Sequence, residues 1–200
     1  MDNASTKAAR TRRYIIEKTA GVFNTKGFAG TSMSDLTAVT GLTKGSIYGN
    51  FENKEAVAAA VFDHNYGEVV KLVNRRMEKE TTYYGKLMVY AGAYGDFIRK
   101  GYPKGGCPVL NTAVEADDTN DVLKVRAAQA IAGWKKSIES LIKGGMAAGE
   151  FRPGLDPAQL ALAMIALIEG GVMIAKVTDT PAHLNKVLKT LEWMLGEMRL

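Results

Sequence analysis

The segment LTKGSIYGNFENKE, residues 42–55, stands out in a chain whose apolar residues otherwise recur at helical spacing. It places hydroxyl groups, lysines, two glycines and two aromatic side chains within a short span. Each glycine lowers helix stability by about 1 kcal/mol relative to alanine, so a helix carrying Gly45 and Gly49 on one face needs a reason to keep them. A close approach of the backbone to a binding partner supplies that reason.

The residues before this segment predict a second short helix, over residues 34–40. Gly41 permits the left-handed backbone of a sharp turn between the two helices. The apolar residues that could lock the pair together are Leu36, Val39, Leu42 and Ile47. The pattern predicts a helix-turn-helix whose second helix presents short polar groups to phosphates and base edges in a major groove.

The rest of the chain shows no strand signal and predicts an all-α fold of about nine helices. The expected ranges are Lys7–Lys26, Ser34–Thr40, Thr43–Tyr48, Lys54–Lys79, Tyr83–Lys100, Val109–Ala116, Asn120–Ala148, Pro157–Val177 and Pro181 to the C-terminus. Proline and glycine mark several of the ends, as at Gly27 and at Pro157 in a first turn. The prediction is an N-terminal three-helix DNA-binding domain followed by a larger C-terminal helical domain.

Charge and composition agree with this division. The 200 residues carry a net charge of +5, and the first 60 hold eight basic and five acidic residues. We therefore place a DNA-binding domain at residues 1–52 and a larger C-terminal domain at residues 53–200. The single Cys107 excludes an intramolecular disulfide and fits a reducing cytosol. The start shows no apolar segment typical of a secretory signal, and we expect a cytoplasmic protein.

Three parts of the N-terminal region resemble the DNA-binding signature of the tetracycline-repressor (TetR/AcrR) family: FAGTSMSDL at residues 28–36, GLTKGSIY at 41–48, and Phe51 with Lys54-Glu55. The resemblance covers roughly Arg10 to Phe62. The C-terminal half matches more loosely, through GEF at residues 149–151 and LIEGG at 167–171. The chain departs from the family pattern at Thr37, where alanine is frequent, and at Gly49, where histidine or another larger residue is frequent.

The resemblance implies roles for individual residues. Thr31, Ser32, Thr43, Tyr48 and Lys54 correspond to residues that cap helices or contact phosphate. Lys44, Ser46 and Asn50 are candidates for base contacts, Gly45 and Gly49 for close backbone approach, and Arg13, with Arg10 and Arg12, for an arm along the DNA. Plain packing is the alternative for the aromatic residues, and a solvated, frayed terminus for the arm.

In the C-terminal domain, the leucines of the last helix recur at spacings of four and three residues, as in helix bundles. We predict a homodimer through a four-helix interface formed by the last two helices and their copies. The interface candidates are Leu160, Met164, Leu167, Gly171, Leu184, Leu188, Leu191 and Leu195. A monomeric core is the alternative. The apolar run from Leu160 to Val177 is broken by Glu169 and Lys176, so we interpret it as a buried helix and expect no membrane partner.

The resemblance implies that residues 53–200 form a ligand-binding and dimerisation domain with a pocket in its central helices. The composition of these helices suggests an apolar or aromatic effector. Candidate lining residues are Phe62, Tyr66, Tyr94, Phe97, Cys107, Trp134, Met164 and Ile168; for each of them a core position is the alternative. Cys107 also lies at the expected start of a helix, which can lower the pKa of a thiol. A thiol that senses electrophiles and a buried, inert cysteine both remain open.

These features favour a ligand-responsive transcriptional regulator, a repressor in the first instance, that binds a palindromic double-stranded DNA operator. We expect no catalytic residues, no metal site and no cofactor. Only His64 and His183 are present, and the chain has no nucleophile motif or phosphate-cradling glycine loop. The alternatives are a small helical enzyme and a helical adaptor or membrane-surface protein. The second alternative would leave the residues from Thr43 to Lys54 without a role.

Overall fold

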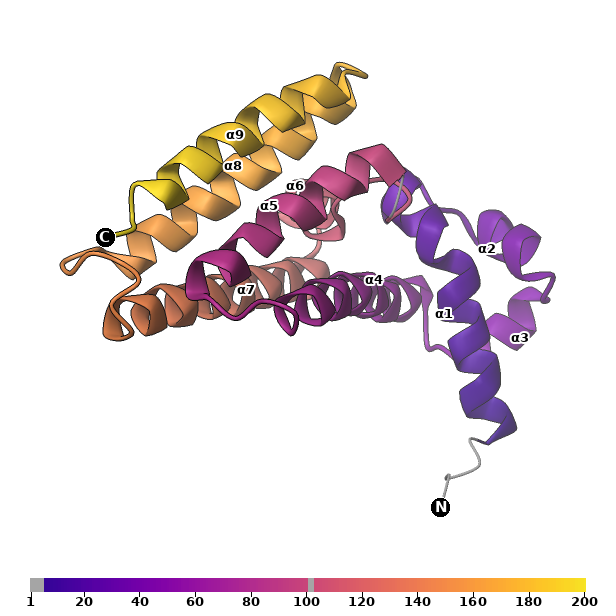
Figure 1. Ribbon diagram of the computed structural model, residues 1–200. Coiled ribbons are helices and arrows are strands. Elements are labelled where there is room, and N and C mark those ends of the chain that lie inside the picture. The colour runs from indigo at the N-terminus through magenta and orange to yellow at the C-terminus, as the bar shows by residue number, and fades with distance from the viewer. Residues whose placement is uncertain (1–5, 101–102) are drawn as a thin grey trace. The chain divides into compact units, whose positions relative to one another are not determined.

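The computed structural model describes residues 6–100 and 103–200, and their side chains except those of residues 97–100. Within these ranges the chain forms nine helices (Figure 1). They are α1 (Lys7–Lys26), α2 (Met33–Thr40), α3 (Lys44–Tyr48), α4 (Lys54–Met77), α5 (Tyr83–Lys100), α6 (Pro108–Ala116), α7 (Asp121–Ala147), α8 (Pro157–Val177) and α9 (Pro181–Gly196). The predicted all-α fold is confirmed, and most of the predicted helix ends lie within two residues of those observed.

Side-chain caps explain where the N-terminal helices begin. The hydroxyl oxygen of Thr43 accepts a hydrogen bond from the Ser46 amide at the start of α3. Asn53 caps α4 in the same way, with its side-chain oxygen 2.8 Å from the amide nitrogen of Ala56. Gly41 ends α2 in the left-handed conformation, at φ 68° and ψ 9°, which turns the chain sharply into α3.

The chain divides into two compact units, Met1–Glu68 with Pro103–Ala128, and Val69–Tyr102 with Gln129–Leu200. The first unit contains the helix-turn-helix and is built on one apolar cluster. Its most deeply buried members include Ile15, Leu36 and Ile47, each fully buried. Two of the four residues predicted to lock the helix pair are thus in the core, whereas Leu42 is half-buried and Val39 is exposed. The first unit also includes α6 and the start of α7, in addition to the predicted DNA-binding domain.

In the second unit, α8 and α9 lie side by side and both contact α5 (Figure 1). Close approach of α8 and α9 depends on Gly171, because a Cβ there would lie only 2.8 Å from a methyl group of Leu184. Helix α8 is long and apolar enough to span a membrane by length and composition. Its residues Met164, Ile168 and Val172 are nevertheless fully buried within the unit, as in the core helix of a globular domain.

Candidate nucleic-acid interface

Helix α3 is amphipathic despite its short length. Ile47 is fully buried, whereas Thr43, Lys44, Gly45 and Tyr48 are exposed. The ammonium group of Lys44 lies 5.8 Å from the centre of the Tyr48 ring, so a positive charge and a phenol lie together on the open face. These groups suit contacts to phosphates and base edges.

The C-terminal end of α3 is fixed by Arg12 of α1. The Arg12 guanidinium donates a hydrogen bond of 2.6 Å to the backbone oxygen of Asn50, and it lies 3.9 Å from the centre of the Phe51 ring. The side-chain amide of Asn50 donates to the backbone oxygen of Ser46, so one of its two N–H groups is used within the protein. Gly49 follows the last residue of α3, is exposed, and presents no side chain at this end of the helix. Arg12, a residue of the predicted basic arm, therefore holds α3 in place.

Tyr14 fixes the turn of the helix-turn-helix. Its hydroxyl donates a hydrogen bond of 2.9 Å to the backbone oxygen of Thr40, the last residue of α2. This side chain was not among the predicted site residues. The sequence shows only that Tyr14 lies on α1. Its position there does not reveal a contact with a residue 26 positions away.

The start of α2 is held by an ionic and hydrogen-bonded cap. Ser32 and Asp35 form a reciprocal capping box, and the ammonium group of Lys26 lies 2.6 Å from the Asp35 carboxylate. The Lys26 ammonium and the two hydrogen bonds from Ser32 hold the pKa of the Asp35 carboxyl well below its usual range. Ser32 is exposed, but Thr31 is buried and its hydroxyl donates to the backbone oxygen of Gly27. The Thr31 side chain therefore builds the turn and is not open to a phosphate.

Lys54 is also engaged within the protein. Its ammonium group donates to the backbone oxygens of Phe28 and Thr31, at 2.8 and 2.9 Å, and lies 4.2 Å from the centre of the Phe28 ring. An ammonium group has three donors, so one remains for a phosphate. The main role of Lys54 in this structure is to hold the turn between α1 and α2.

The predicted ligand-binding residues fall into separate groups. Phe62, Tyr66 and Cys107 belong to the first unit, and Tyr94, Trp134, Met164 and Ile168 belong to the second. Phe97 lies outside the described side chains. The placement of the two units relative to each other is not described. That the eight residues line one pocket therefore stays a prediction.

In the first unit, the rings of Phe62 and Tyr66 stack with their centres 6.2 Å apart. Cys107 is 1% exposed and precedes Pro108 at the start of α6. Burial, together with the neighbouring Cys107, raises the pKa of the Tyr66 phenol. The thiol is thus enclosed by protein, as expected for a core position, and a reagent would need the surrounding structure to open.

In the second unit, the rings of Tyr94 and Trp134 stack with their centres 5.1 Å apart and their planes 4° from parallel. Trp134 is 5% exposed, and its indole N–H has no hydrogen-bond partner among the described residues. Met164 and Ile168 are fully buried. An unsatisfied buried donor beside stacked rings is an unusual feature of an apolar core.

The predicted dimer contacts lie mostly inside a single chain. Met164, Gly171, Leu184, Leu188, Leu191 and Leu195 are buried, and only Leu160 and Leu167 are half-buried. The leucine stripe of α9 therefore packs within the unit. The exposed apolar surface lies on another face of α8, which carries Leu162, Ala166, Met173, Ile174 and Val177, and on α9 at Trp193.

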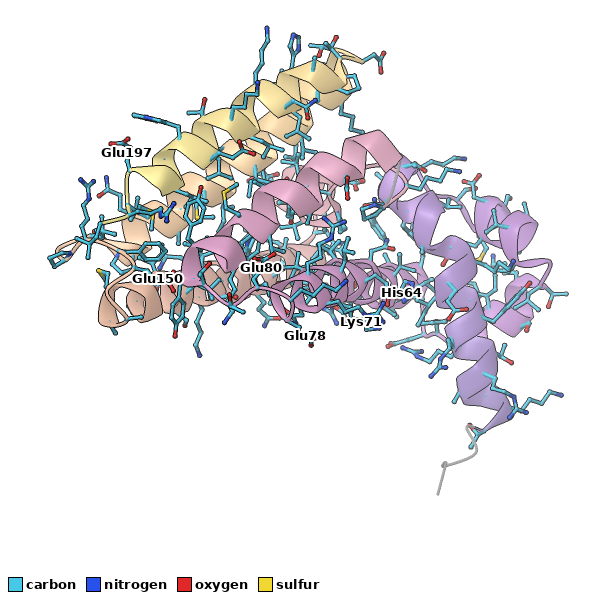
Figure 2. All side chains as sticks on the ribbon, in the orientation of Figure 1. His64, Lys71, Glu78, Glu80, Glu150 and Glu197 are labelled. Atoms are coloured by element: carbon cyan, nitrogen blue, oxygen red, sulfur yellow. The ribbon has the colours of Figure 1, made fainter. Side chains whose placement is uncertain are left out.

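No group of three or more histidine, cysteine, aspartate or glutamate side chains among the described residues could hold a metal ion. The acidic side chains labelled in Figure 2 include Glu150, whose carboxylate accepts a hydrogen bond from the amide of Tyr84. This carboxylate satisfies a backbone donor at the start of α5, which is a structural role.

Comparison with known proteins agrees with these features. Residues 15–61 match the family described as "Bacterial regulatory proteins, tetR family", and residues 84–191 match "Tetracyclin repressor-like, C-terminal domain". A TetR-family transcriptional regulator from Cytophaga hutchinsonii is 48% identical, with 99% of each chain covered and a TM-score of 0.96. A TetR transcriptional regulator from Chloroflexus aurantiacus J-10-FL is 35% identical, covering 96% of this chain and 98% of that one, with a TM-score of 0.92.

Among curated relatives, the HTH-type transcriptional repressor DhaR of Mycobacterium sp. (strain GP1) is 28% identical over 178 residues, which is 88% of each chain. Members of this family are transcriptional regulators with a DNA-binding helix-turn-helix and not enzymes, which confirms both the predicted resemblance and the predicted absence of enzymatic activity. Both parts of the family pattern are present in one chain, so this protein belongs to the TetR family of bacterial transcriptional regulators.

Proposed function

We propose that this protein is a dimeric, cytoplasmic repressor that binds a palindromic operator and is released from it by a small effector. The observation that carries the proposal is the open face of α3, on which Thr43, Lys44 and Tyr48 are exposed around the buried anchor Ile47. A relative of matching length is a repressor by name, which supports the direction of regulation. Residues 1–52 would bind DNA, and residues 53–200 would bind the effector and the second subunit.

DNA binding can be tested directly with a duplex selected from a random pool. The double variant Lys44→Ala/Tyr48→Ala removes the charge and the phenol of the open face and should abolish specific binding. Lys186→Ala is the matched control, because Lys186 is equally exposed but lies on α9. Affinity of the unaltered protein should fall steeply with salt, since phosphate contacts release counterions. Specific binding that survives the double variant would place the DNA contacts elsewhere.

The dimer should form through the exposed apolar face of α8. Leu162 is 50% exposed, Ile174 40% and Trp193 66%, which is a large apolar surface to leave in water. A dimer with two-fold symmetry is what recognition of a palindromic operator requires. Leu162→Glu/Ile174→Glu should yield monomers in light scattering, whereas Val114→Glu on α6 should not. Val114 is even more exposed, at 69%.

The effector is expected to be apolar or aromatic. The stacked Tyr94–Trp134 pair offers a flat surface, and the indole N–H of Trp134 would be satisfied by an acceptor atom of the compound. An aromatic carbonyl compound has both properties. Binding should quench tryptophan fluorescence in the Trp193→Phe variant, in which only Trp134 remains. If Trp134 emission stays unchanged with every compound that releases DNA, the effector binds elsewhere.

An electrophilic effector would act through Cys107. Because the thiol is 1% exposed, a reagent can react only when the start of α6 opens, and the adduct would then keep it open. Cys107→Ser should retain DNA binding and lose release by electrophiles. Equal release in the variant and in the unaltered protein would remove Cys107 from the mechanism.

A further inference from the structure

We propose that Glu115 of α6 is a positioning residue for DNA binding, acting through the turn between α1 and α2. The proposal needs only the DNA binding of the family and not a particular effector. The turn spans residues 27–31 and leads directly into Ser32, the cap of α2. Lys54 of α4 and Glu115 of α6 both form hydrogen bonds with this turn. Lys54 donates to its backbone oxygens, and Glu115 accepts from its backbone amides.

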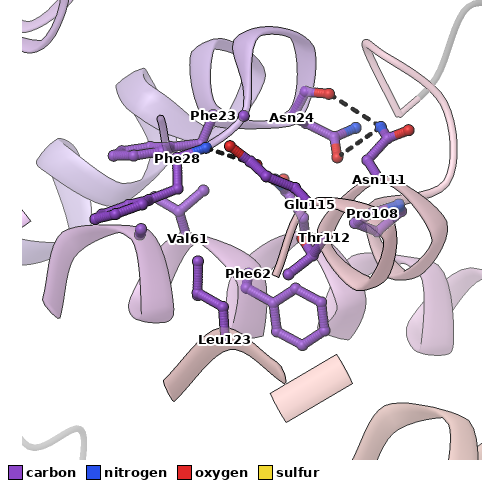
Figure 3. A pocket seen from close by; sticks show the side chains of 13 residues that line it. Phe23, Asn24, Phe28, Val61, Phe62, Pro108, Asn111, Thr112, Glu115 and Leu123 are labelled. Carbon is purple, nitrogen blue, oxygen red and sulfur yellow. Dashed lines mark hydrogen bonds between the residues drawn. The ribbon is translucent and has the colours of Figure 1, made fainter. Parts of the chain in front are cut away.

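The Glu115 carboxylate binds two consecutive amides of the turn. One oxygen accepts from the Phe28 amide, as Figure 3 shows, and the other accepts from the Ala29 amide, each at 2.8 Å. These amides lie beyond the end of α1 and have no partner in its helical ladder. Two charge-assisted hydrogen bonds on consecutive amides fix the position and the orientation of the peptide units between them.

Gly27 makes this approach possible. Its φ is 73°, in the region that favours glycine, and a Cβ built there would collide with the Glu115 carboxylate. Position 27 therefore needs glycine for two reasons. The first is the positive φ, and the second is the space that the Glu115 carboxylate occupies. The second exists only because the acidic side chain comes so close to the main chain.

A second contact anchors α6 and the loop before it to the same end of α1. The side-chain amide of Asn24 donates to the backbone oxygens of Lys104 and Gly106, at 2.7 and 2.9 Å. The side-chain amide of Asn111 donates in turn to the backbone oxygen of Asn24 at 3.0 Å, as Figure 3 shows, and to that of Gly105 at 2.9 Å. Asn24 is 7% exposed, so this network is enclosed. Any displacement of α6 therefore acts on the end of α1 and on the turn after it.

The packing around Glu115 leaves room for it to move. A cavity of about 30 Å³ is lined by Phe28, Phe62, Asn111 and Glu115, among others (Figure 3). Such a volume can hold one or two water molecules. Water there can take over the hydrogen bonds of a carboxylate that leaves the turn, which makes release less costly than in a filled core. The Phe28–Ala29 turn would then be held by Lys54 alone.

The test uses the full chain and the duplex selected for it. Glu115→Gln keeps the size of the side chain but replaces one acceptor with an amide group that cannot accept. Loss of one charge-assisted hydrogen bond corresponds to about tenfold in an equilibrium constant, so the duplex should bind about tenfold more weakly. Glu197→Gln, an exposed position on the C-terminal side of α9, is the matched control and should bind normally.

A second pair of variants separates the contact from backbone strain. Gly27→Ala meets both the strained φ and the Glu115 carboxylate. Gly149→Ala also places a side chain at a positive φ, 71°, but has open space around the added carbon. Only Gly27→Ala should weaken duplex binding. Equal affinity of the two variants for the duplex would overturn the proposal.

Amide exchange supplies a measurement that a merely stabilising contact would not change. If the Glu115 contact favours DNA binding, DNA binding must strengthen the contact by the same factor. The Phe28 and Ala29 amides should therefore exchange more slowly when duplex is added to the unaltered protein, and the slowing should be lost in Glu115→Gln. Unchanged exchange on adding duplex would refute the coupling. A failure of the unaltered protein to bind any duplex would instead refute DNA binding itself.

Discussion

Replacing Lys54 by methionine tests whether this lysine serves the protein more than the DNA. The change keeps the apolar stem but removes two hydrogen bonds, to the backbone oxygens of Phe28 and Thr31, and the contact with the Phe28 ring. Hydrogen bonds to a charged group contribute about 1.5–3 kcal/mol each. Lys54 is half-buried, so water can replace part of the loss, and we expect a net destabilisation of about 2 kcal/mol.

The measurement is native-state hydrogen exchange of the amides of α1 and α2, which reports on this part of the chain separately from the second compact unit. Lys44→Met is the matched control, because Lys44 is exposed and its ammonium group lies no nearer than 5.8 Å to the centre of the Tyr48 ring. That control should weaken duplex binding and leave exchange unchanged. A Lys54→Met protein whose α1 and α2 amides exchange like those of the unaltered protein would show that the two carbonyl contacts contribute nothing.

Three further predictions concern the caps and the helix packing. The pKa of Asp35 is lower in the folded state than its unfolded value of 3.8. The ionised carboxylate therefore stabilises the fold fully above that pH, and this stabilisation is lost as the pH falls below it. The difference in unfolding free energy between the unaltered protein and Asp35→Asn should shrink on acidification from about pH 6 to about pH 3. Thr43→Ala removes the cap of α3 and should cost about 1 kcal/mol in unfolding experiments, together with duplex affinity. Gly171→Ala should lower the free energy of unfolding by about 1–3 kcal/mol through its clash with Leu184, whereas Gly67→Ala, in open space on α4, should raise it by up to about 1 kcal/mol.

The helix ends and the fold were predicted correctly from signals close together in the sequence. Helix ends were readable because the signals that start and stop a helix lie within one turn of its end, as with Ser32, Thr43 and Gly41. The helix-turn-helix was readable for the same reason, since its two helices and its turn are consecutive in the chain. The family resemblance depended on this one continuous region.

Partners far apart in the chain were not readable. From the sequence, Lys54 is a candidate phosphate contact and Glu115 is an ordinary surface charge. In the structure Lys54 holds backbone oxygens 23 and 26 residues away, and Glu115 holds amides 86 and 87 residues away. Every residue has a backbone oxygen and every residue except proline has an amide N–H, so residue type does not mark the ones that a distant side chain will contact.

The leucine stripe of α9 shows the same limit for packing. Its spacing correctly predicted one apolar face, but periodicity does not distinguish a face that packs within the chain from one that packs on a second subunit. In the structure Leu184, Leu188 and Leu191 are buried within the unit, and the exposed apolar residues are Leu162 and Ile174 of α8. The sequence by itself determined that this is a helical, DNA-binding TetR-type chain, because caps, turns and helical periods are local. Only the tertiary structure decided which charges clamp the turn and which apolar face stays open, because those depend on which helices meet.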